Sequence, residues 1–116
     1  MKITESLDRV TGILADAGLT AGPDTDTLQA PCAWVAVNKV RAGEMLNGDG
    51  ELDLEIFLIA PDNGYLDSIR QLQSMLKQAL TVISPDGEID LAAGVQTNAG
   101  VLPAFKIPLS VKVEAT

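Results

Sequence analysis

Residues 104–114 alternate between apolar and polar side chains, and this run constrains the fold more than any other segment. The apolar positions are Phe105, Ile107, Leu109, Val111 and Val113, and the polar ones include Lys106, Ser110, Lys112 and Glu114. Successive side chains of a strand point to opposite faces of its sheet, so the pattern predicts a strand with one buried face. Pro108 lacks an N–H donor, which predicts that this strand lies at a sheet edge or carries a bulge there.

The remaining patterns predict, in order, a helix, two strands, a second helix and another strand before this last one. The six predicted elements cover residues 3–17, 33–40, 51–60, 65–84, 88–96 and 104–114. The connecting segments 19–27 and 97–103 are predicted loops, and 41–50 is the long tip of a hairpin. The α-β-β-α-β-β order predicts an α+β fold, in which a mainly antiparallel or mixed four-stranded sheet packs against two helices.

The length supports one domain over residues 1–116. A chain of this size buries about two-thirds of its unfolded surface, which is enough for a core without disulfides. We expect the second helix to bury one apolar side, made of Leu66, Ile69, Leu72, Leu76, Leu80 and Ile83. In the strand at 88–96, the alternating apolar residues are Ile89, Leu91, Ala93 and Val95.

The net charge of −8 argues against sequence-independent nucleic-acid binding, which needs clustered Lys and Arg, and against an anionic membrane surface. DNA could pass such a chain without adhering, because like charges repel. The first residues lack the pattern of a signal peptide, and no apolar run approaches the ~20 residues of a membrane span. We therefore expect no membrane partner and a place of action in the cytoplasm or in an assembly built there.

Catalytic patterns are missing from the sequence. The chain has no His and one Cys, so the usual nucleophile–base pairs and zinc ligand sets cannot be built. Neither a phosphate-binding loop nor a dinucleotide fingerprint is present. Asp53 and Glu55 are expected to be solvated residues on the polar face of their strand. Lys106 and Lys112 are expected either to pair with them across neighbouring strands or to be solvated. Trp34 is expected to be a partly buried core or interface anchor. We predict no enzyme activity, no catalytic residue, no cofactor and no metal.

Four segments give the chain a resemblance to the tail terminator proteins of long-tailed bacteriophages, particularly those of actinobacterial hosts. The segments are MKITESLDRVTGILADAG, ELDLEIFLIAPD, LDSIRQLQSMLKQAL and VQTNAGVLPAFKIPLSVKV. The resemblance implies a virion protein of the tail and neck, assembled in the host cytoplasm as a homo-oligomeric ring, usually of six subunits. Such a ring caps the tail tube, ends its polymerisation and contacts the head-completion proteins, and DNA passes through its channel without specific binding.

An interface in such a ring would need apolar burial or paired strand edges, because the subunits repel one another through their negative charge. The candidate interface elements are the hairpin tip around Met45 and Leu46, the loop from Thr97 to Leu102 and the edge of the last strand. The candidate interface residues are Arg41, Met45, Leu46, Asn98, Val101 and Leu102.

Other readings of the same pattern remain open. A small regulatory or ligand-binding α+β module could act as a dimer, but the ferredoxin-like order begins with a strand and this chain begins with a helix. An acidic protein that mimics DNA would need carboxylates arrayed along one surface, whereas these are scattered. An enzyme that uses only Asp, Glu and Lys has the least support.

Overall fold

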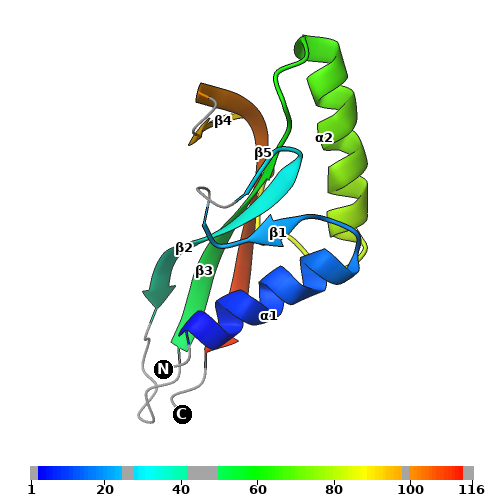
Figure 1. Ribbon diagram of the computed structural model, residues 1–116. Coiled ribbons are helices and arrows are strands. Elements are labelled where there is room, and N and C mark those ends of the chain that lie inside the picture. The colour runs from blue at the N-terminus through cyan, green and yellow to red at the C-terminus, as the bar shows by residue number, and fades with distance from the viewer. Residues whose placement is uncertain (1–2, 25–27, 42–49, 98–99, 114–116) are drawn as a thin grey trace.

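The computed structural model describes residues 3–24, 28–41, 50–97 and 100–113, and it contains two helices and one five-stranded sheet (Figure 1). The elements are α1 (Ile3–Asp16), β1 (Ala21–Gly22), β2 (Cys32–Arg41), β3 (Gly50–Ile59), α2 (Tyr65–Leu80), β4 (Asp90–Thr97) and β5 (Gly100–Val113). The strand order in the sheet is β1-β2-β3-β5-β4. The predicted α+β class, with two helices against one sheet, is confirmed.

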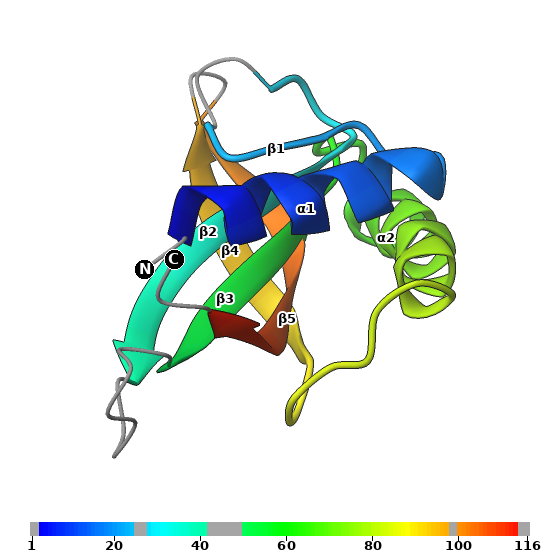
Figure 2. The same ribbon diagram turned by 90° about the horizontal axis from the view of Figure 1, so that it is seen from below.

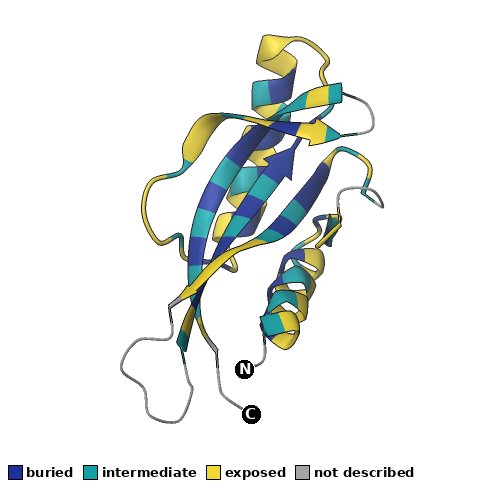
Figure 3. Cartoon of the chain, turned by 90° about the vertical axis from the view of Figure 1, so that its left-hand side faces the viewer, coloured by how far each residue is buried: buried dark blue, intermediate teal, exposed yellow. Residues whose placement is uncertain are grey.

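Both helices pack on the same face of the sheet. Val10 and Leu14 of α1 and Leu72 and Met75 of α2 share one core cluster with the inward residues of β3 and β5. In Figure 2, α1 is seen from the side and α2 nearly end-on, so the two helices run in different directions over that face. The central strands alternate between buried and intermediate positions along their length (Figure 3), as the period of two in the sequence predicts. We call the covered side the helix face and the other side the open face.

The sheet has five strands where four were predicted, because β1 lies inside the segment predicted to be a loop. Ala21 and Gly22 pair in parallel with Ala33 and Trp34, and the Ala33 N–H donates to the Thr20 carbonyl at 2.7 Å. A strand of two residues has no periodicity to detect, so only tertiary pairing reveals it. The N-terminal helix ends at Asp16, one residue before its predicted end, and Gly18 follows with a φ of 99° that favours glycine.

Residues 97–103 were also predicted to be a loop, but most of them are strand. β5 begins at Gly100, whose φ is 97°, and Val101 and Leu102 pair with Gln96 and Val95 of β4. The Thr97 hydroxyl donates to the Gly100 carbonyl at 2.9 Å and closes the turn. The small residues of this segment favour a turn locally, but the β4 ladder supplies hydrogen bonds that extend the strand.

Pro108 was predicted to mark an edge strand or a bulge, yet β5 lies between β3 and β4. The Pro108 carbonyl accepts a hydrogen bond from the Asp86 N–H at 2.9 Å. In an antiparallel strand the N–H and C=O of one residue point to the same side, so the position without a donor faces the loop at Asp86. β4 pairs with β5 only as far as Lys106, and beyond it this side of β5 is locally an edge.

Helix α2 differs from its prediction in length and in its buried side. It ends at Leu80 rather than at residue 84, before Pro85, whose ring disfavours helical backbone in the preceding residue. Its fully buried residues are Ser68, Leu72, Met75 and Ala79. Leu66 and Leu80, which were predicted to be buried, are exposed, because the side that contacts the sheet is rotated away from them.

Ser68 supports the N-terminal end of α2, and its loss is expected to destabilise the chain. The buried hydroxyl donates to the Pro61 carbonyl at 3.0 Å and accepts from the Asn63 N–H at 3.4 Å. Ser68→Ala removes both of these hydrogen bonds, but the Asn63 N–H still donates to the Pro61 carbonyl at 3.0 Å. The substitution should therefore lower the free energy of unfolding by about 0.5–1.5 kcal/mol in urea titrations. Ser74→Ala, at an exposed position of the same helix, is the control and should change it by less than about 0.5 kcal/mol. Equal losses in the two variants would contradict this role.

Candidate functional site: the open face and the two sheet edges

The half of the open face near the end of β5 is charged and paired across strands. Lys106 of β5 lies 3.7 Å from the Glu55 carboxylate of β3, and the Ser110 hydroxyl lies 2.8 Å from Glu51 and 3.0 Å from Asp53. The predicted cross-strand pairing of Lys106 with Glu55 is confirmed. Such partly exposed ion pairs contribute about 0–1 kcal/mol. A hollow of about 330 Å³ is lined by Asp53, Glu55 and Lys106 of this group and by Lys39.

The other half of the open face is aromatic and apolar. The Trp34 and Phe57 rings stack with centroids 4.9 Å apart and an interplanar angle of 23°, and Trp34 Nε1 donates to the Pro23 carbonyl at 3.1 Å. This pair borders a second small core of Cys32, Ile59, Val95 and Ala104. Burial raises the pKa of the Cys32 thiol, which lowers its reactivity. Trp34 is thus a partly buried packing residue, in agreement with the first of the two roles expected for it.

Neither a metal site nor a membrane span stands out in the part of the chain that the structure describes. Its His, Cys, Asp and Glu residues include no group of three or more placed to hold a metal ion. None of its helices has the length and apolar character needed to cross a bilayer.

Each end of the sheet has an edge strand. On one side β1 pairs with only Ala33 and Trp34 of β2, so among the residues that the structure describes β2 is the edge over residues 35–41. On the other side β4 ends the sheet over residues 90–97. Both edges carry a register shift and an exposed charge, with Lys39 on β2 and Asp90 on β4. Charges and bulges on edges discourage pairing with the wrong partner.

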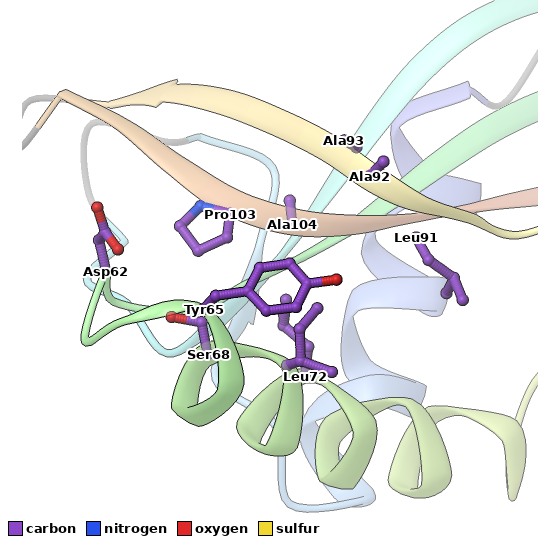
Figure 4. A pocket seen from close by; sticks show the side chains of 10 residues that line it. Asp62, Tyr65, Ser68, Leu72, Leu91, Ala92, Ala93, Pro103 and Ala104 are labelled. Atoms are coloured by element: carbon purple, nitrogen blue, oxygen red, sulfur yellow. The ribbon is translucent and has the colours of Figure 1, made fainter.

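An apolar groove of about 440 Å³ lies between α2 and the β4–β5 hairpin. The Tyr65 ring extends from the first turn of α2 into this space, with Pro103 and Ala104 above it and Leu91 beyond its hydroxyl (Figure 4). Tyr65 is 78% exposed and Leu91 is 56% exposed, so two large apolar side chains of the groove contact water. The open groove therefore lies next to the edge formed by β4.

The predicted interface residues lie in different parts of the chain and differ in exposure. Met45, Leu46 and Asn98 lie outside the described residues, and Arg41 is the last residue of β2, opposite Glu51. Val101 is exposed, whereas Leu102 is half-buried and packs against the small core of the open face. These two neighbours on β5 therefore face opposite sides of the sheet.

The sequence patterns did not predict that Tyr65 and Leu91 are exposed. The alternation of Ile89, Leu91, Ala93 and Val95 predicted that all four share one face, but the register shifts between Asp90 and Ala93, and Leu91 is displaced to the surface. The position of Tyr65 directly after the Gly64 break was a signal that it precedes the buried side of the helix.

The fold defines the class of the chain as a small single-domain α+β protein whose sheet is covered by helices on one face. The sequence matches no protein-family model and no curated protein.

Proposed function

We propose that this chain is a structural virion protein that forms a ring on the end of a phage tail tube. The ring ends tube polymerisation, joins the tail to the head-completion complex and surrounds the channel through which DNA passes. The support is the resemblance of four segments spread over the whole sequence, together with the geometry of the sheet edges. The six-subunit number comes from the resemblance, as do the tube and head-completion partners and the assembly in the host cytoplasm.

One observation supports the proposal most directly: the two edge strands run in opposite directions. β2, β3, β5 and β4 are each antiparallel to the next, so β4 is antiparallel to β2. When β2 of a second copy adds beside β4 in antiparallel pairing, the strands and helices of that copy have the same orientation as those of the first. Repetition of such a head-to-tail contact generates a ring if the rotation closes. A ring in which all copies have the same orientation has two different ends. This suits a cap, because one end would contact the tube and the other the head.

The charges of the open face are compatible with DNA passage through the ring. The three lysines of this face that the structure describes each have a carboxylate nearby, since Lys39 is opposite Asp53, Lys112 is opposite Glu51, and Lys106 pairs with Glu55. Described lysines on this face are thus balanced by acidic partners and form no basic stripe for phosphate. Six copies would carry 6 × −8 = −48, which also opposes binding of DNA.

The mass of the purified chain in solution tests this proposal. Native mass spectrometry and light scattering over a range of concentrations should reveal hexamers, and electron microscopy should show rings with a central channel. If rings form only on tube ends, the same images should show capped tubes of limited length when the chain is mixed with a polymerising tube protein encoded beside it. A stable dimer that carries a bound small molecule would support the regulatory module instead.

A further inference from the structure

We propose that the groove between α2 and β4 receives the β2 edge of a neighbouring copy of this chain. In this contact Val37 and Val40 of one copy cover Tyr65 and Leu91 of the other, and Lys39 meets Asp90. The inference rests on the proposed ring and names the surface that would join its subunits. Two features of the described residues support it: the face on which each side chain lies and the charges of the edges.

The exposed apolar residues of both edges lie on the same face of the sheet. Val37 is opposite Leu54 and Val40 is opposite Leu52, and both leucines are buried under the helices. Val37 and Val40 therefore belong to the helix face, yet they are 45% and 39% exposed. Tyr65 and Leu91 line a groove whose floor includes Leu72 of α2, so they too lie on the helix side. A sheet continued from β4 into a second β2 would bring these four side chains together and remove them from water.

The charges of the two edges lie together on the opposite face. Lys39 is opposite Asp53, and Asp90 is opposite Lys106, which places both on the open face. Pairing of β2 with β2, or of β4 with β4, would bring like charges together and is disfavoured. Pairing of β2 with β4 brings Lys39 to Asp90, so the charges select the head-to-tail contact over a two-fold dimer. Asp90 Oδ1 already accepts the Ala92 N–H at 2.9 Å, but a carboxylate has room for further donors.

The charge pair also sets the register of the contact. With Lys39 beside Asp90 in antiparallel pairing, Ala36 and Val35 lie beside Ala93 and Gly94, and β1 already pairs with the next two residues of β2. The new backbone ladder would therefore be short, and the bulge at 90–93 would hold Leu91 over the groove. The groove and the charge pair would then provide both affinity and register.

Charge reversal at the two edges tests this contact. Lys39→Glu and Asp90→Lys should each weaken self-association of the full chain by roughly tenfold or more, measured by native mass spectrometry and light scattering. The two single variants should assemble again when mixed, because the carboxylate introduced on the β2 edge of one chain then meets the ammonium introduced on the β4 edge of the other. The second contact of such a mixed pair keeps the original Lys39 and Asp90. The double variant in one chain should also assemble. Circular dichroism checks that each variant is folded.

The apolar half of the contact has its own matched pair of variants. Leu91→Asp, inside the groove, should weaken assembly by a larger factor than Leu66→Asp, on an exposed leucine of α2 that does not line the groove. If oligomers form and neither charge reversal nor Leu91→Asp weakens them beyond Leu66→Asp, this inference is wrong and the ring uses another surface. A chain that forms no oligomer alone or on tube ends contradicts both the proposed function and this contact.

Discussion

Replacing Leu54 with alanine is expected to lower the free energy of unfolding by about 2–5 kcal/mol. Leu54 is 1% exposed, and it lies on β3, which pairs with β2 on one side and β5 on the other. Its neighbours in the ladder are Val37 and Leu109, and its side chain belongs to the core cluster under both helices. The substitution removes buried methyl groups and leaves a cavity that strands held on both sides cannot fully close.

Urea denaturation followed by the fluorescence of Trp34, the single tryptophan of the chain, measures this loss. Leu66→Ala is the matched control, because it makes the same chemical change at a position that is 64% exposed. Alanine is a good helix former, so this control should alter stability by less than about 0.5 kcal/mol. A Leu54→Ala loss as small as that of the control would show that β3 is not the centre of the core.

Trp34→Ala should be the second most damaging change, with an expected loss of about 2–3 kcal/mol, below the range for fully buried aromatic residues. The indole is half-buried, stacks on Phe57 and anchors the chain at Pro23 through its N–H. Its removal takes away buried apolar surface, a stacked ring pair and a hydrogen bond from the small core of the open face.

Trp34→Phe separates these contributions, because it keeps an aromatic ring on Phe57 and removes the donor to Pro23. Its expected cost is about 1 kcal/mol. Urea titrations followed by circular dichroism measure both variants, since the fluorescence probe is lost. A Trp34→Ala variant as stable as the parent would mean that the aromatic pair adds nothing to stability and that Trp34 is free to serve another purpose.

Local patterns predicted the elements that have enough residues to show a period. The strands near residues 51–60 and 104–114 were found because their inward residues recur at every second position over ten or more residues of chain. β1 was missed because two residues carry no period, and the start of β5 was missed because its small residues favour a turn when considered alone. In both cases pairing with a neighbouring strand, rather than the local sequence, makes these residues part of the sheet.

The candidate site was less predictable than the fold, because edges exist only once the strand order is known. The adjacent strands β2–β3 and β4–β5 could be expected to form hairpins. No local sequence pattern, however, indicates that β3 pairs with β5 rather than with β4. Lys39 and Asp90 become edge charges only through that order. Leu91 belongs to the groove only because the register shifts beside it. Val101 was predicted to be an interface residue in a loop; it is exposed, but it belongs to β5.

The pairing of β3 with β5 also sets a sequence of events during synthesis. β3 can join β2 in a hairpin as soon as it leaves the ribosome, but its other side stays uncovered until α2, β4 and then β5 have been made. Contacts between segments so far apart in the chain form late and fold slowly. During that interval an apolar strand with open backbone groups is exposed in the cell, where it can be captured by chaperones or by other nascent chains. Shortened chains that stop before residue 100 should therefore aggregate rather than fold into smaller domains.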